Sequence, residues 1–308
     1  MPERFRFLID EGSLSEVALE GAERLSDAFE NLVAIVQETR EHGVGKHTSV
    51  WEAQLGGHRL YEWLFENARG IDREVATALQ IALDRSPDWD AAWPPSGLPE
   101  EVEISGVAQK AISVSAAIRE TRQGHAVGCL SCRASRSGRL PVLMDGLSTD
   151  VHFISLSGDV LAFFRDVPEI EDLDEDAYFA NARYAFPRVR FVRDRTHFRH
   201  FEESYKSIRR RVTAHLSVIN DHGRSVLDSA EPASAKQARF GSYGINASGE
   251  SAQTRADKKA MKQREVSVGD RVIVCDWHTK LRPHIDRIYF NATSTTTVVV
   301  GAFRDHLD

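Results

Sequence analysis

Apolar residues recur every three or four positions in several segments, which is the spacing of an amphipathic helix. In the first third of the chain this spacing predicts helices over 13–42, 58–68 and 72–85. Further along it predicts helices over 107–122, 174–184 and 194–220. The consecutive prolines Pro94 and Pro95 cannot continue a helix, so we expect a boundary within 86–100.

Other segments are rich in β-branched residues or alternate between apolar and polar positions, which is typical of strands. They predict strands over 102–105, 126–133, 139–145 and 151–156, and again over 271–281, 286–291 and 296–303. The last three lie so close in sequence that they predict an antiparallel meander. Between the two groups, residues 229–264 are small, polar and increasingly basic, and predict a long loop with a short helix near 252–263.

Together these patterns predict an α+β protein. We expect a helical N-terminal region over 1–95 and an α+β region over 96–228 that ends in a long basic helix. A basic connection over 229–264 would then lead to an antiparallel sheet over 265–308, which carries the candidate active site.

Composition excludes several classes of protein. The chain has 308 residues, of which 42% are hydrophobic, but no apolar run approaches the roughly 20 residues of a membrane-spanning helix. The N-terminus has no apolar core of a secretory signal, and three cysteines do not make a disulfide framework. We therefore expect a cytoplasmic protein that does not act in a membrane.

Charge is distributed unevenly along the chain. Residues 1–100 carry a net charge of −10, residues 101–180 carry −6, and residues 181–308 carry +9. This asymmetry favours a nucleic acid, RNA or DNA, as the partner of the C-terminal part, and leaves the acidic N-terminal region for a protein partner. Solvated helix faces with a basic loop are the alternative explanation.

The densest group of chemically capable residues lies between Cys275 and Phe290. On a strand, alternate side chains share a face, so His278 lies beside Lys280, and Arg287 lies beside Tyr289. These four residues could supply general acid–base groups and bind a phosphate, and we predict that they are catalytic. The alternative is the solvated polar face of a half-buried sheet.

The same charge asymmetry predicts that basic residues of the long helix and of the basic connection form one surface with this sheet. These residues are Arg199, Lys206, Arg209 and Arg210 of the helix, and Lys258, Lys259, Lys262 and Arg264 of the connection.

The C-terminal segment resembles the RelE/HigB-type messenger-RNA interferase toxins. Their signature, K-x-K-L-R followed by Y-R-L-x-Y and V-x-x-x-G-K-R, is similar in order and spacing to residues 278–282, 286–290 and 298–304. The resemblance implies phosphate contacts by Lys280, Arg282 and Arg304, transition-state stabilisation by Arg287, and an acid or base at His278. It covers only about 255–308, and this chain lacks the C-terminal catalytic tail of that family.

The resemblance also implies a reaction. The 2′-hydroxyl of RNA attacks the adjacent phosphate, and neither a metal nor another cofactor is required. A toxin or an antiphage-defence effector, in which a large region restrains a small toxic domain, is the setting it implies.

Two alternatives to this ribonuclease stay open. Asp270 or Asp276, followed by His278 and Lys280, partly matches a metal-dependent DNA nuclease. A non-catalytic nucleic-acid-binding or assembly subunit could use the same basic face.

Cys129 and Cys132 form a single C-x-x-C pair. A structural zinc site usually needs four ligands, and Cys275 is the one other cysteine in the sequence. We expect buried strand cysteines rather than a metal or redox site.

Overall fold

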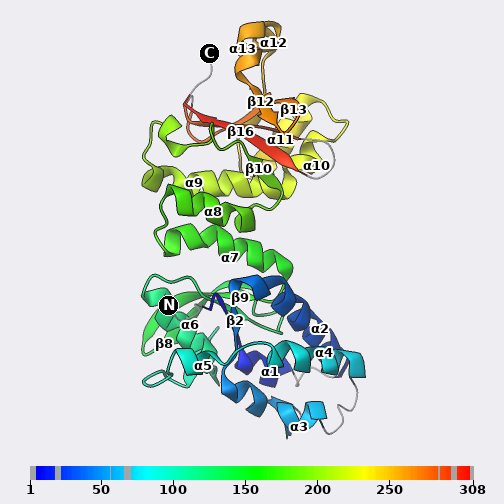
Figure 1. Cartoon of the computed structure of the whole chain (residues 1–308), viewed down its shortest axis with the longest axis vertical. Helices are drawn as coiled ribbons and strands as arrows, with labels where there is room; N and C mark the ends of the chain where they lie inside the picture. The colour runs from blue at the N-terminus through cyan, green and yellow to red at the C-terminus, as the bar shows by residue number, and fades with distance from the viewer. Residues whose placement is uncertain are drawn as a thin grey trace. The chain divides into compact units, whose positions relative to one another are not determined.

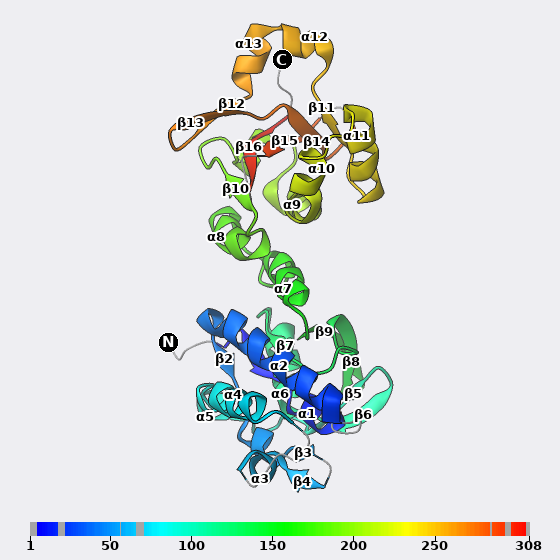
Figure 2. The ribbon, with the colours of Figure 1, turned by 90° about the vertical axis from the view of Figure 1, so that its right-hand side faces the viewer.

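The chain folds into two compact units, Met1–Asp172 and Leu173–Asp308 (Figures 1 and 2). The computed structural model describes residues 5–17, 22–55, 57–65, 71–283, 285–292 and 297–305. Its helices, its mixed sheet and its C-terminal antiparallel strands confirm the predicted α+β class. The chain does not divide at the predicted boundaries, because residues 1–95 contribute strands to the same sheet as residues 96–172.

The N-terminal unit is built on a seven-stranded sheet with the order β2-β1-β7-β9-β8-β5-β6. Strands β2, β1, β7 and β9 are parallel to one another. The pairs β9–β8, β8–β5 and β5–β6 are antiparallel. The strands are β1 (Phe7–Ile9), β2 (Val44–Gly45), β5 (Glu101–Ile104), β6 (Val107–Lys110), β7 (Gly128–Leu130), β8 (Gly138–Met144) and β9 (Leu147–Ile154). A two-stranded sheet pairs β3 (Gln54–Leu55) with β4 (His58–Arg59).

Helices cover both faces of this sheet. Phe7 packs against Phe163 and Phe164 of α7, whereas its neighbour Leu8 joins the buried cluster of Val114 and other residues of α6. The helices are α1 (Glu11–Val17), α2 (Ala22–Thr39), α3 (Leu60–Phe65), α4 (Arg73–Asp84), α5 (Trp89–Ala92), α6 (Ile112–Arg122) and α7 (Ser157–Ile170), with 3-10 turns η2 (Arg40–His42) and η3 (Thr48–Glu52).

The predicted helix over 107–122 is wrong in its first turn. Residues 107–110 form β6, which pairs with β5 in a tight hairpin. Ser105 and Gly106 have φ angles of 53° and 82°, and this pair of left-handed residues makes the two-residue turn that joins the strands. The helix begins only at Ile112.

The C-terminal unit is built on a five-stranded sheet with the order β10-β16-β15-β14-β11. Only the β10–β16 pair is parallel. The strands are β10 (Val189–Phe191), β11 (Ala247–Gly249), β14 (Trp277–Lys280), β15 (Arg287–Ala292) and β16 (Val298–Arg304), and a separate hairpin pairs β12 (Glu265–Val268) with β13 (Arg271–Val274). The predicted single strand over 271–281 is therefore two strands in two sheets. The connection between the predicted strands 286–291 and 296–303 lies largely outside the described residues.

Helices and turns surround this second sheet (Figure 2). They are α8 (Glu175–Ala185), the 3-10 turn η4 (Phe198–His200), α9 (Tyr205–Val218), a π-helical turn η5 (Ile219–Gly223), α10 (Arg224–Leu227), α11 (Ala233–Ser242), α12 (Ala252–Ala256) and α13 (Lys258–Gln263). The predicted short helix near 252–263 corresponds to α12 and α13, but the rest of the predicted loop over 229–264 also contains α11 and β11. The predicted helix over 194–220 begins at Tyr205 instead.

The two faces of the C-terminal sheet are covered by different segments. Thr279 bonds His215 of α9, with 2.7 Å between Thr279 Oγ1 and His215 Nδ1. His278 and Lys280 flank Thr279 and therefore lie on the other face. On that face Tyr289 clusters with Val266 of the hairpin and with Cys275.

None of the described helices has the length and apolar character needed to cross a membrane.

Candidate nucleic-acid interface

Strands β14, β15 and β16 bring three basic residues into one row. Lys280 lies opposite Arg287, and Arg287 lies opposite Arg304. Directly opposed residues of an antiparallel pair project from the same face. Two residues along each strand, and therefore on the same face, His278 lies opposite Tyr289. Lys280 and Arg287 therefore share a face, as the period-two pattern predicted. We call Lys280, Arg287 and Arg304 the cation row.

The charges of the cation row are not neutralised. Within the described part of the chain, none of the three side chains forms an ion pair with a carboxylate, and all three are half-exposed. The Nε atom of Arg287 is buried and has no hydrogen-bond partner among the described residues. Like charges directly opposite one another destabilise a sheet. An anion bound at the row would relieve this repulsion and would accept the unused hydrogen bonds.

A fourth basic residue, Arg195, lies close to the row. Arg195 donates hydrogen bonds to the carbonyl oxygens of Glu265, at 2.6 Å, and of Gln263. Burial lowers the pKa of its guanidinium, and the nearby charge of Arg304 lowers it further. The positive potential at this end of the sheet is thus larger than the row alone supplies.

His200 adjoins the row and was missed by sequence reasoning. Arg304 Nη1 donates to His200 Nδ1 at 3.1 Å, and an arginine cannot accept, so the proton of the neutral ring is on Nε2. Burial, followed by the charges of Arg304 and Arg199, lowers the pKa of His200. Its Nε2 is buried without a partner in the described structure, which leaves a donor for a bound anion.

Two of the predicted catalytic residues are enclosed. The exposed fractions of His278 and Tyr289 are 6% and 1%. His278 Nδ1 lies 3.3 Å from Glu250 Oε1, and Arg264 Nε bonds the same oxygen at 2.8 Å. The Tyr289 hydroxyl has no partner among the described residues. The four residues share one face of the sheet, but residues 250–275 cover His278 and Tyr289, whereas Lys280 and Arg287 stay half-exposed.

Glu250 holds this enclosed group together. Burial alone would raise the pKa of its carboxyl, but the interactions with His278 and Arg264 outweigh burial and lower the pKa to about 2. The carboxylate is therefore ionised across the physiological range. It balances the buried Arg264 guanidinium and orients the His278 ring.

The predicted continuous basic surface does not form. Arg209 and Arg264 are buried, and Arg282 is paired with Glu202, Glu203 and Asp286 at distances of 3.2, 3.0 and 2.5 Å. Arg210 belongs to α9, on the sheet face opposite the cation row. The exposed lysines lie on α13, namely Lys258, Lys259 and Lys262.

The structure gives little support to a metal site. Nowhere in the described ranges do three His, Cys, Asp or Glu side chains come together as metal ligands. Asp276, a residue of the metal-dependent alternative, is paired with Arg255 at 3.1 Å. Cys129 and Cys132 are buried free thiols, as expected, and burial raises the pKa of Cys132 to about 12.

Comparison with known proteins gives no match to the chain, whether with a family model, a curated protein or a solved structure. The resemblance to the RelE/HigB-type toxins therefore stays a resemblance of three short segments.

Proposed function

We propose that the C-terminal unit binds RNA at the cation row and cleaves it without a metal ion. The observation that carries this proposal is the row itself, because Lys280, Arg287 and Arg304 lie side by side with no carboxylate partner among the described residues. A phosphodiester supplies the missing negative charge, and its oxygens match the unused donors of Arg287 and His200.

The row suits the charge that develops during RNA cleavage. The 2′-oxygen forms a bond to phosphorus while the bond to the 5′-oxygen breaks, which leaves a 2′,3′-cyclic phosphate. A base takes the proton of the 2′-hydroxyl, and an acid returns a proton to the 5′-oxygen. Preorganised cations stabilise the extra negative charge of the transition state. His200 and, once uncovered, His278 are the candidate proton carriers.

A second candidate function is nucleic-acid binding without cleavage. It is favoured by the enclosure of His278 and Tyr289, since a proton carrier has to reach its substrate. In that case Glu250, Arg264 and His278 form a structural group, and the cation row alone contacts phosphates.

The test uses the full-length protein with labelled single-stranded RNA, single-stranded DNA and duplex DNA, each with Mg²⁺ and with EDTA. We expect RNA to be cut in both conditions and the products to carry cyclic or 3′-phosphate ends. Lys280→Ala and Arg287→Ala should each slow cleavage about 10²–10³-fold. Arg40→Ala with Arg85→Ala removes two exposed charges from the other unit and should change nothing.

Binding is measured in the same series across a range of salt concentrations. Each lost phosphate contact should reduce the slope of log K against log salt by about 0.7 for a single strand. Salt-dependent RNA binding without any cleavage favours the second function. Cleavage of DNA that EDTA abolishes, with strong damage by Asp276→Asn, favours a metal-dependent nuclease and contradicts the proposal.

A further inference from the structure

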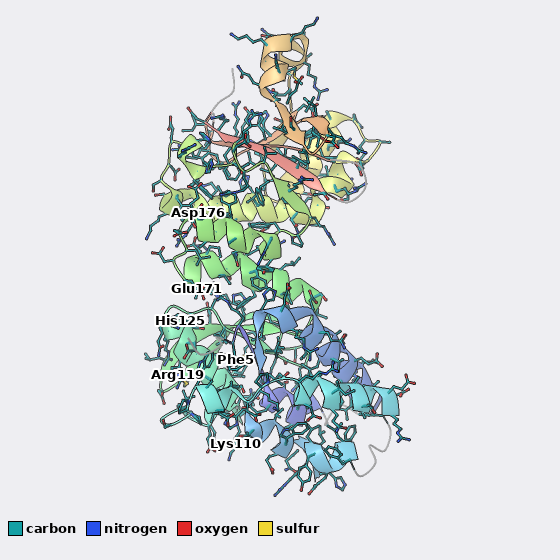
Figure 3. All side chains as sticks on the ribbon, in the orientation of Figure 1. Phe5, Lys110, Arg119, His125, Glu171 and Asp176 are labelled. Carbon is teal, nitrogen blue, oxygen red and sulfur yellow. The ribbon has the colours of Figure 1, made fainter. Side chains whose placement is uncertain are left out.

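The N-terminal unit contains a cavity of about 350 Å³ beside α1 and α6. Its lining combines carboxylates, one histidine, one lysine and apolar side chains. The lining residues that matter here are Glu11, His47, Glu52, Glu100, Lys110 and Ile112; Lys110 is labelled in Figure 3. The volume lies at the lower end of the range of small-molecule sites, which is roughly 300–1,000 Å³.

Glu11 is the unusual residue of this cavity. Its Oε1 accepts a hydrogen bond from the Ser113 amide at 3.0 Å. Its Oε2 is buried and has no partner in the part of the chain that the structure describes. Burial, more than the neighbouring Asp10, raises the pKa of Glu11 to about 7. A buried carboxyl oxygen without a partner costs free energy, so a ligand that supplies a donor would be stabilised here.

Glu11 begins α1, just beyond the end of strand β1, where open α/β sheets commonly bind their ligands. Glu11 follows the carboxyl end of β1, which lies beside the carboxyl end of β7. The next strand in the chain after β1, which is β2, lies on one side of the β1–β7 pair. The next strands after β7, which are β8 and β9, lie on the other side. Ligands of such sheets bind outside the carboxyl ends of the strands, where the connections diverge in this way.

The charges around the cavity select the kind of ligand. Lys110 is paired with Glu100 at 3.5 Å, and Glu52 is paired with Arg59 at 3.1 Å. Burial lowers the pKa of His47 more than its acidic neighbours raise it, so its ring is neutral at pH 7. Asp10 is paired with Arg136 at 2.5 Å. Glu11 is thus the one lining carboxyl in the described structure without a counter-ion.

We propose that this cavity binds a small organic ammonium compound, with Glu11 as its counter-ion. Only one oxygen of Glu11 is free, which suits the single point charge of an ammonium group better than a two-pronged guanidinium. The apolar portion of the ligand would lie against Ile112 and Ala53.

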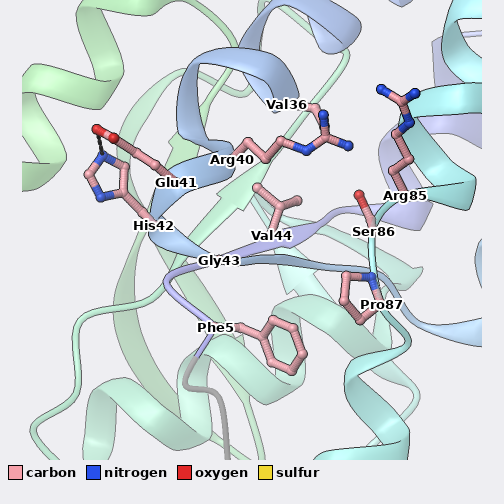
Figure 4. A pocket seen from close by; sticks show the side chains of 10 residues that line it. All are labelled: Phe5, Val36, Arg40, Glu41, His42, Gly43, Val44, Arg85, Ser86 and Pro87. Carbon is pink, nitrogen blue, oxygen red and sulfur yellow. Dashed lines mark ion pairs between the residues drawn. The ribbon is translucent and has the colours of Figure 1, made fainter.

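Another cavity of the unit, also about 350 Å³, is of a different kind. Figure 4 shows Arg40 and Arg85 on one side of it and the Phe5 ring on the other. Both arginines are exposed, and no lining side chain among the described residues is buried without a partner. This cavity lacks the enclosed group that distinguishes Glu11.

The test compares n-butylamine and benzylamine with butan-1-ol, benzyl alcohol and butyrate, by ligand-observed NMR and calorimetry on the full-length protein. The amines should bind at least about tenfold more tightly than the alcohols, and butyrate should not bind. Because Glu11 ionises around pH 7, amine affinity should rise about tenfold from pH 6 to pH 8.

Two variants assign this preference to Glu11. Glu11→Gln keeps an acceptor for the Ser113 amide and should abolish both the amine preference and the pH dependence. Asp84→Asn, at an exposed position of α4 outside this lining, should preserve both. The pH series on the unsubstituted protein is decisive even where Glu11→Gln does not fold. Equal affinity for amines and alcohols, affinity independent of pH, or no binding at millimolar concentration would each overturn the proposal.

Discussion

Glu250 shows how one buried carboxylate can organise a group of basic side chains. Its Oε1 lies within ion-pair distance of both Arg264 and His278. The Arg264 guanidinium also lies 5.6 Å from the centre of the Tyr289 ring. A buried charge that loses its partner is strongly destabilising, so Glu250 stabilises Arg264 in its place over Tyr289.

Replacement of Glu250 by glutamine should lower the free energy of unfolding by about 3 kcal/mol at pH 7. The unfolded carboxyl titrates near pH 4.5 and the folded one near 2, so its contribution is present above pH 4.5 and is lost as the pH falls toward 2. Denaturant unfolding of both proteins between pH 7 and pH 2.5 measures the difference. A difference that stays constant over this range would contradict the assignment.

At the level of single residues, the sequence predicts only part of the candidate site. Alternation along strands is enough to place Lys280 and Arg287 on one face. It does not reveal His200, which reaches Arg304 from a turn more than a hundred residues earlier. It also does not reveal the burial of His278, because the covering segment has the composition of a loop.

The contact between α9 and β14 depends on a buried neutral histidine. His215 bonds Thr279, and burial, assisted by the charge of Arg211, lowers the pKa of His215 to about 4. The unfolded ring titrates near 6.5, so protons favour the unfolded state between these values. The helix therefore packs on the sheet most stably above pH 6.5.

We expect the C-terminal unit to lose about 3 kcal/mol of stability as the pH falls from 6.5 to 4. His215→Gln keeps a donor for Thr279 Oγ1, whose own hydrogen goes to the Asn246 carbonyl, and does not titrate, so its stability should change much less over the same range. Unfolding curves at half-unit pH intervals provide the measurement. Parallel pH profiles for the two proteins would show that His215 is not responsible.

The hairpin of β12 and β13 and strand β16 approach closely at Gly301. A Cβ atom at this position would lie against Cys275 Sγ and 3.1 Å from Val266 Cγ1. Gly301→Ala should therefore destabilise the unit by about 1–3 kcal/mol, as overpacking does. Cys275→Ala in the same chain should recover part of the loss. If the double variant is as unstable as the sum of the two single variants, the contact is not the cause.

At the level of elements, two shorter helices that begin after an aspartate N-cap were predicted best. The helices over 72–85 and 174–184 closely match α4 and α8. The predicted helix over 194–220 begins too early in the sequence, since α9 begins at Tyr205. Phe198 and Phe201 lie before it and are buried by packing against Phe303. Periodicity cannot distinguish that arrangement from a helical stripe.

At the level of the whole molecule, the two units differ in charge. The unit Met1–Asp172 carries 16 Lys and Arg against 29 Asp and Glu, a net of −13, and the unit Leu173–Asp308 carries 23 against 17, a net of +6. Each unit has its own sheet and its own buried core. Separate cores commonly unfold in separate steps.

We expect calorimetry of the full chain to resolve two transitions. Gly301→Ala should lower one of them by several degrees, since about 1 kcal/mol shifts the midpoint of a domain of this size by roughly 2–8 °C. The other transition should not move. A single transition that shifts as a whole would show that the units unfold together.

The β-bulge between β15 and β16 has an evolutionary consequence. At this point Tyr289 pairs with Ala302 but Phe290 pairs with Val300, so β16 carries one additional residue. Loss or gain of one residue between Gly301 and Arg304 would turn Arg304 to the opposite face, although the composition would hardly change. Distant homologues that share the cation row should therefore preserve the interval of seven positions from Lys280 to Arg287 and of three from Gly301 to Arg304. The sequence positions of their other basic residues can differ.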